Sequence, residues 1–460
     1  MQSSLHLQLV LLVSSAGLST AAVAQEGEIG PKLRGPSGYA RIDALLPRTT
    51  NVIEAIEVRG NQRTREGVIR RRILLSEGDL LDDRSIEESR LRLLGTGYFS
   101  SVEFRLERGS ERGLVILIAE VRERNTLVVD RLFLGYSEVS PVFAGGGLAD
   151  TNFLGRGVTV GAEFVVGDSR QAASLRGFVP YLADTPLQLS ISAILARGEE
   201  LLDSDDPSGV ALSYERFGGT FGIGFGVGPA QRVSLIYRLE TINADRLPNL
   251  DPPFLRAAPS ILFDDSLLST MSLLYEQDTL DDPFVPTAGS SLELSVEVGT
   301  SLLGSDYEFS KYFGRGLVAF EPSAGHSLVL RAAAGLIQGR TPFFNQFFIG
   351  DFTYFAFGRD SLPRPVGLNF SEHNDYDDLL LSGGVEYAVP VHRGRSFVYR
   401  VYLYGGFEAV ATASLDEIQE DPTGRGAGGF FPLSFDAGLK LDTDLGTFTF
   451  SLAYLLELAL

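Results

Sequence analysis

The residue types that most often perform catalysis or hold metals are sparse in this chain. The four histidines, His6, His326, His373 and His392, are scattered, and no nucleophile–base pattern or metal-ligand spacing involves them. His373 lies in an acidic stretch, residues 372–375, where a solvated side chain is favoured over a metal ligand. Cysteine is absent, which excludes disulfides, thiolate metal sites and a lipid-modified N-terminal cysteine. We therefore expect no enzyme, no metal site and no cofactor.

The charge of the chain excludes some classes of binding partner. The formal net charge is −20, and because the charges within residues 51–126 cancel, the excess acid lies in residues 127–460. No basic stripe exists, so nucleic acid is not expected as a partner. The acidic segments, such as residues 203–207 and 375–378, lack a calcium-loop pattern and are interpreted as solvated loops.

The N-terminus has the features of an export signal. An apolar stretch over residues 7–18 is followed by Ala22-Val23-Ala24, a small-residue cleavage pattern. We expect residues 1–24 to be a signal peptide, although its first residues carry no Lys or Arg. Residues 25–50 are rich in Gly and Pro and are predicted to be a linker.

A small soluble domain is predicted over residues 51–126. Its patterns run strand, helix, helix, strand, strand, which is enough for one α+β domain. The expected elements are residues 52–58, 64–74, 82–94, 99–106 and 114–121.

Residues 127–460 show a different pattern, in which apolar and polar residues alternate with a period of two. Clear stretches are residues 158–166, 187–193, 291–298 and 447–454. Such segments fit tilted membrane strands, and after the signal there is no apolar run of 18 residues. A soluble β-sandwich or propeller is the alternative. The export signal, the missing disulfides and the many long strands without a repeat period favour an antiparallel transmembrane β-barrel.

Specific motifs resemble a known family. Residues 56–61 and 93–102 resemble a POTRA domain, and residues 127–460 resemble the barrels of the BamA/TamA-type bacterial surface antigen family. Four segments in order carry the barrel resemblance: residues 150–157, 278–289, 384–390 and 439–454. The resemblance implies a mostly β fold, a barrel of about 16 strands behind one POTRA-like domain. It also implies a central turn with the pattern D-x-x-D-[ND]-P-x-x-P-x-x-G, here Asp278, Asp281, Asp282, Pro283, Pro286 and Gly289.

One functional motif of the family is altered. Its sixth loop carries V-R-G-[FY], with an Arg that reaches into the barrel, and here Ala356 stands at the Arg position. Residues 402–406, in the strand that usually supplies the acidic partner, contain no acid. We expect both halves of this ion pair to be lost, unless Arg359 or Arg364 substitutes. The expected loop tip is Gly350, Asp351, Phe355, Ala356, Phe357, Gly358 and Arg359.

The resemblance implies insertion or translocation of proteins at the outer membrane of a Gram-negative bacterium, with the POTRA-like domain in the periplasm. The expected partners are unfolded or nascent outer-membrane or secreted proteins, outer-membrane lipid and periplasmic accessory proteins. An exposed sheet edge would capture an extended client strand, and the candidate is Glu103-Phe104-Arg105-Leu106. Two alternatives stay open: a passive channel or structural barrel without assembly activity, and a secretion pore for one dedicated partner.

Overall fold

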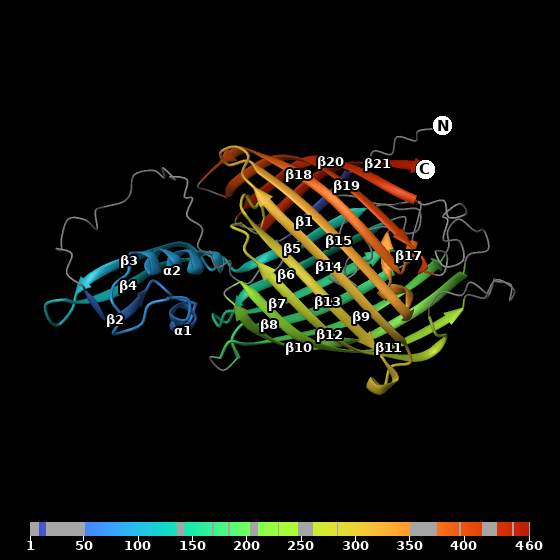
Figure 1. Cartoon of the computed structure of the whole chain (residues 1–460), viewed down its shortest axis with the longest axis horizontal. Helices are drawn as coiled ribbons and strands as arrows, with labels where there is room; N and C mark the ends of the chain where they lie inside the picture. Colours follow the sequence, from blue (N-terminus) through green and yellow to red (C-terminus); the bar gives the residue numbers. More distant parts are fainter. Residues whose placement is uncertain are drawn as a thin grey trace. The chain divides into compact units, whose positions relative to one another are not determined.

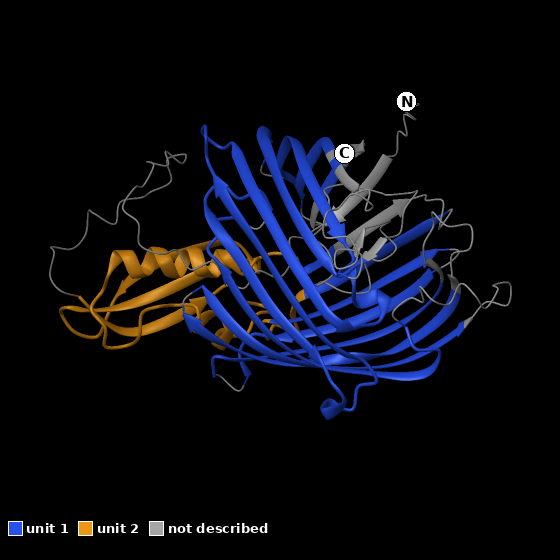
Figure 2. Cartoon of the chain, turned by 45° about the vertical axis from the view of Figure 1, so that its right-hand side comes forward, with its two compact units in different colours: residues 1–19, 127–150, 158–460 blue, residues 20–126, 151–157 orange. Residues whose placement is uncertain are grey.

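The computed structural model of this chain separates into two compact units (Figure 2). The smaller unit comprises residues 20–126 and 151–157, and the larger one comprises residues 1–19, 127–150 and 158–460. The structure describes residues 9–14, 51–135, 142–167, 170–182, 185–202, 210–228, 230–246, 261–282, 284–349, 375–394, 397–415, 430–443 and 446–459.

The smaller unit has the predicted order of strand, helix, helix, strand, strand. Its sheet has the strand order β2-β4-β3, with β2 parallel and β3 antiparallel to the central strand β4. Asp82 begins the longer helix by accepting hydrogen bonds from the amides of Arg84 and Ser85. The elements are β2 (Val52–Arg59), α1 (Glu66–Arg70), α2 (Asp83–Gly95), β3 (Phe99–Arg108) and β4 (Leu114–Glu123).

The first helix is shorter than the sequence pattern predicts. The expected helix reaches residue 74, but α1 ends at Arg70. Beyond it Ile73 and Leu75 are buried while Leu74 is exposed, so the apolar side chains alternate as in an extended chain. The pattern was ambiguous because adjacent apolar residues are compatible with the helical period and with the strand period.

Residues 151–157, expected as a barrel turn, pack as part of the smaller unit. The Asn152 amide nitrogen donates to the Thr64 hydroxyl at 2.8 Å, and the Arg65 amide donates to the Gly155 carbonyl at 2.9 Å. Gly155 has φ +68°, and a Cβ there would lie 1.8 Å from the Arg63 carbonyl oxygen, so only glycine fits. The turn between β6 (Phe143–Phe153) and β7 (Val158–Gly167) therefore completes the packing of this unit.

Glu123 organises the loop on which that turn packs. Its carboxylate accepts hydrogen bonds from the backbone amides of Gln62, Arg63 and Thr64, the last at 2.6 Å. Partial burial opposes ionisation of Glu123, but these bonds outweigh that effect and hold its pKa below the ordinary value. The charged form is therefore the one that stabilises the loop.

We predict that Glu123→Gln weakens this loop by about 1–3 kcal/mol, because a charged acceptor of several amides is lost. Trypsin cleavage after Arg63 and Arg65 in the folded chain measures the opening. Because the folded-state pKa is lowered, the stabilisation is present above the unfolded-state pKa and is lost as pH falls through the folded-state value. Glu120→Gln is the matched control, since Glu120 lies on the same strand and pairs with Arg105 at 3.0 Å. Equal cleavage of both variants would contradict this role.

The larger unit is one antiparallel sheet curled into a barrel (Figure 1). Fifteen strands follow each other around it, with β15 and β18 adjacent. Together with β6 and β7 they are β5 (Leu127–Gly135), β8 (Arg170–Val179), β9 (Leu187–Leu202), β10 (Val210–Gly228), β11 (Gln231–Arg246), β12 (Asp264–Asp278), β13 (Gly289–Gly299), β14 (Glu308–Phe320), β15 (Ser327–Arg340), β18 (Leu379–Arg393), β19 (Val398–Ala413), β20 (Phe430–Thr443) and β21 (Gly446–Ala459).

The barrel has two unlike ends. One end, here the turn end, is where β6, β8, β10, β12, β14, β18 and β20 finish. The other, the loop end, is where β5, β7, β9, β11, β13, β15 and β19 finish. Four short elements belong to the loop-end connections: η4 (Ser301–Leu303), η5 (Phe343–Asn345) and the paired strands β16 (Phe347–Ile349) and β17 (Asp375–Asp377).

The predicted alternation is confirmed along the strands. In β10 the outward residues Phe217, Phe221, Ile223, Phe225 and Val227 are large, apolar and exposed, whereas Tyr214 and Arg216 on the inward side are buried. The outward face becomes polar at the loop end, at Glu215. An apolar stretch of this length in a tilted strand spans about 25 Å, which matches the apolar band of a membrane barrel.

A short N-terminal strand lies between the first and last of the fifteen. β1 (Leu9–Ser14) pairs antiparallel with β21 through Leu9–Leu12 and with β5 through Val13 and Ser14. These residues fall within the predicted signal peptide, and removal of that peptide stays a prediction. Among the described residues no helix is long and apolar enough to cross a membrane.

Candidate functional site in the barrel lumen and at the strand seam

The long connection between β15 and β18 begins inside the barrel. Phe343 and Phe344 join a buried cluster with inward side chains of the strands, including Tyr214 and Phe309. Phe347, in β16, is fully buried in a second cluster with wall residues of β14, β15, β18 and β19. Three aromatic rings from one connection therefore pack against the inward face of the wall at the loop end.

Basic residues of the barrel wall hold this segment. The Arg238 guanidinium donates to the Asn345 side-chain oxygen at 3.0 Å, and Lys311 Nζ donates to the Asn345 carbonyl at 2.8 Å. The Arg216 guanidinium lies 3.6 Å from the centre of the Phe344 ring, in a cation–π contact. The amide, the carbonyl and the ring therefore all meet a positive charge from the wall.

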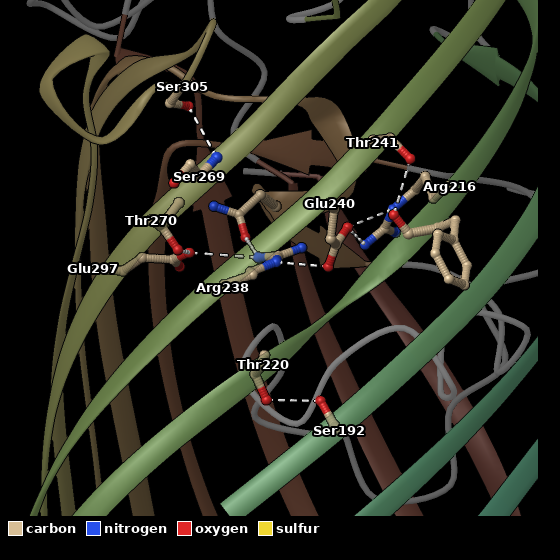
Figure 3. A network of polar contacts seen from close by, with 12 residues as sticks. Ser192, Arg216, Thr220, Arg238, Glu240, Thr241, Ser269, Thr270, Glu297 and Ser305 are labelled. Carbon is tan, nitrogen blue, oxygen red and sulfur yellow. Dashed lines mark hydrogen bonds and ion pairs between the residues drawn. The ribbon is translucent and has the colours of Figure 1, made fainter.

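The wall cations are held in turn by acids of neighbouring strands (Figure 3). Glu240 accepts from Arg216 at 2.8 Å and from Arg238 at 2.7 Å, and Glu297 accepts from the Thr270 hydroxyl at 2.8 Å. The Arg216 and Glu240 side chains are almost completely buried. Removing one partner of such a pair destabilises by about 3–5 kcal/mol, because it leaves a buried charge.

The predicted loop tip, Gly350 to Arg359, and Arg364 lie outside the described residues. Residues 402–406 contain no acid, and the loss of the ion pair between loop and wall stays a prediction. Glu408 on the same inward face of β19 is buried, as are Glu386 and Asp436 on the flanking strands. The sequence did not point to the wall arginines, because the family pattern places the cation in the loop. Their inward position within alternating strands was the signal available.

A second polar cluster lines the lumen nearer the turn end. Glu386 of β18 is paired with Lys440 of β20 and with Arg331 of β15, the latter at 3.1 Å. Lys440 also lies 4.9 Å from the centre of the Tyr404 ring. Charges of both signs therefore alternate around the interior wall.

The central turn, residues 279–288, is organised by the predicted aspartates. Asp281 accepts from the Thr287 and Ala288 amides at 2.8 and 3.0 Å, and Asp282 accepts from the Phe284 and Val285 amides at 2.8 and 3.0 Å. Asp278 accepts from the Leu280 amide at 3.0 Å. Pro286 accepts through its carbonyl from Ser327 at 2.5 Å, whereas Pro283 lies outside the described residues.

Gly289 closes this turn in a conformation that requires glycine. Its φ is +97°, and a Cβ there would lie 2.2 Å from the Thr279 carbonyl oxygen.

The predicted client-binding residues lie on an outer strand of the small sheet. Glu103 and Arg105 of β3 are well exposed, whereas Phe104 and Leu106 pack against the core. The opposite edge, at β2, is partly covered, because the Ile53 amide donates to Asp79 and the Ile53 carbonyl accepts from Gly78. β3 is thus the more accessible edge for an added strand.

The seam of the barrel lies between β5 and β21, where β1 stands. On its other side β5 pairs with three consecutive glycines of β6, Gly145 to Gly147, opposite Phe133, Leu132 and Arg131. Glycine weakens a strand because it loses more backbone entropy and offers no side chain to pack. The pairing of the first barrel strand, β5, with β6 is therefore weak.

Comparison with known proteins agrees with this architecture. Residues 152–456 match the Omp85 superfamily domain. The chain belongs to the Omp85 superfamily. Residues 51–124 match the POTRA family, described as a surface antigen variable number repeat. The resemblance predicted from the motifs is thereby confirmed.

Curated relatives in the superfamily include assembly factors. The chain is 24% identical over 302 residues to the outer membrane protein assembly factor BamA of Nitratidesulfovibrio vulgaris, covering 65% of this chain and 36% of that protein. It is 24% identical over 283 residues to BamA of Neorickettsia risticii, covering 61% and 36%. The chain thus spans about a third of the length of these relatives.

Solved structures in the superfamily share the fold. BamA from Haemophilus ducreyi lacking POTRA domains 1–3 has a TM-score of 0.56 and 16% identity, over 89% of this chain and 81% of that one. CdiB from Escherichia coli has a TM-score of 0.59 and 12% identity, over 88% and 77%. At these identities the likeness concerns the fold alone.

We predict that Asn345→Leu lowers the stability of this Omp85 barrel by about 1.5–3 kcal/mol, since a hydrogen bond from the Arg238 cation is lost. Asn345→Asp keeps an acceptor, adds a charge next to that cation and should preserve or raise stability. The measurement is the temperature at which the folded band disappears in heat-modifiability gels. Arg197→Gln, on the outward face where Arg197 meets Gln171 at 2.7 Å, is the control. The same shift for Leu and Asp would mean that packing, not the cation, sets the effect.

Proposed function

We propose that this chain assists the insertion or translocation of other proteins at the outer membrane of a Gram-negative bacterium. The smaller unit lies in the periplasm, captures an extended client strand along β3 and passes it to the barrel seam. Clients are unfolded or nascent outer-membrane or secreted proteins. No covalent chemistry, metal or cofactor is needed, because backbone hydrogen bonding drives each step.

The observation that carries this proposal is the pairing at the seam. Fifteen successive antiparallel strands leave the first and last, β5 and β21, running in the same direction. A strand antiparallel to both fits between them, and β1 pairs in this way with each. Such pairing uses backbone groups and is therefore tolerant of sequence. A client strand could occupy the position that β1 holds.

The membrane supplies the driving force. Unpaired backbone groups at a sheet edge in hydrocarbon are unfavourable by several kcal/mol each. A seam that offers its edges to a client strand satisfies groups on both chains during insertion. The glycines of β6 next to β5 support this role, since a weakly held first strand can move.

The passive channel is less well supported. The lumen at the loop end is filled by Phe343, Phe344 and Phe347, each at most 4% exposed. A channel that conducts constantly would instead keep a hydrated path along its polar wall.

The deciding experiment is reconstitution of the purified chain into liposomes, with two readouts: ion conductance and the folding rate of an unrelated barrel protein. We expect acceleration of folding. Conductance without acceleration would overturn the proposal in favour of the passive channel.

We further predict that removal of residues 1–24 increases this acceleration, because Leu9–Ser14 no longer occupy the seam. The full chain and the shortened chain are compared at equal amounts of folded protein. If the two accelerate equally, the seam is not where clients bind, whatever the activity of the chain.

Client capture by β3 predicts a pattern of photo-crosslinks. A photoreactive residue at Glu103 or Arg105 should form adducts with an unfolded client, because both side chains are more than 60% exposed on the open edge strand. The control is Glu57 on β2, whose edge is covered in part by residues 78–81 and by Arg70, which donates to the Ile56 carbonyl. Adducts of equal yield at Glu57 would exclude β3 as the capture edge.

A further inference from the structure

The central turn, residues 279–288, does more than connect β12 to β13. Val285 is 1% exposed and packs on Ala388, Tyr402 and Tyr404, which are inward side chains of β18 and β19. Leu403, between the two tyrosines, is outward and exposed. The turn therefore folds into the lumen and reaches the wall at β18 and β19.

That reach is considerable. Between β13 and β19 the sheet places β14, β15 and β18, so the two strands are about 19 Å apart along the wall. The carbonyl of Pro286 also accepts from the Ser327 hydroxyl at the start of β15. The turn is thus fixed to the wall at successive points across the turn end.

An ion pair fastens the tip of the turn. Arg400 of β19 donates to Asp282 and also to Asp442 of β20, with the latter at 2.7 Å. Asp282 at the same time accepts from the Phe284 and Val285 amides. One carboxylate therefore both shapes the turn and ties it to β19, through charge-assisted bonds.

At the loop end of the same lumen, aromatic side chains of the connection between β15 and β18 pack against the wall. Phe343, Phe344 and Phe347 pack between the inward faces of the strands and are held by Arg216, Arg238 and Lys311. Between these aromatic rings and the central turn lie the paired charges of Glu386, Lys440 and Arg331.

We propose that the central turn is a latch, closed by Asp282 and Arg400, that narrows the lumen at the turn end in series with the aromatic segment at the loop end. The lumen then has a constriction at each of these two levels, with the paired charges of Glu386, Lys440 and Arg331 between them. Release of one constriction leaves the other in place. This property concerns the lumen and holds whether or not the chain assembles proteins at its seam.

The first test is chemical and uses the absence of cysteine from the chain. A single Val285→Cys is treated with a bulky, charged maleimide in the folded, full-length protein. We expect slow labelling, and labelling about tenfold faster or more when Arg400→Gln is added, since a charge-assisted bond that holds the turn is lost. Asp282→Asn serves as a second release variant if Arg400→Gln does not fold.

Asp442→Asn is the matched control. It removes the other acid that contacts Arg400 and leaves the bond to Asp282, so labelling should stay close to that of Val285→Cys alone. Fast labelling of Val285→Cys itself, or no acceleration by either release variant, would overturn the latch.

The second test measures single-channel conductance in planar bilayers. Arg400→Gln and the pair Phe343→Ser with Phe344→Ser should each raise conductance slightly, because one constriction remains. Their combination should exceed the sum of the two increases. A combined variant that conducts no better than the more conductive parent would show that the constrictions are not in series. Heat-modifiability confirms that each variant is folded.

Discussion

A sheet that spans a membrane must pair every backbone N–H and C=O group, and the rest of this structure depends on that constraint. It makes the strands long and antiparallel, and it forces the sheet to curl until its edges meet. With fifteen successive strands the edges are parallel to each other, so β1 between them is the strand that restores antiparallel pairing on both sides. The constraint is therefore hardest to satisfy at the seam between β5 and β21.

The interior follows a second rule, that charges removed from water must be paired. The inward faces of β10 to β13 carry Arg216, Arg238, Glu240 and Glu297 in mutual contact, and this network determines where the loop segment can rest. In the described part of the loop segment, the Asn345 amide and the Phe344 ring contact positive charges of the wall.

Local signals allowed much of the fold to be predicted. Period-two alternation and the turn motifs indicated the strands, and the helix predicted over residues 82–94 corresponds to α2, which is capped by Asp82. The contacts in the lumen were harder to predict. Asp282 and Arg400 are 118 residues apart, and neither segment carries a pattern that identifies the other as its partner. The same applies to Asn345 and Arg238. Contacts across a barrel depend on register accumulated over many strands, which a single sequence does not display.

The packing of residues 151–157 within the smaller unit sets an order in which the parts of the chain can fold. During synthesis and export, residues 51–126 emerge first, yet the bonds from Asn152 to Thr64 and from Arg65 to Gly155 must wait for the first barrel hairpin to arrive. The smaller unit is therefore complete only after residues 151–157 have been synthesised and exported. A copy stalled before residue 152 would lack the groups that bond to Thr64 and Arg65.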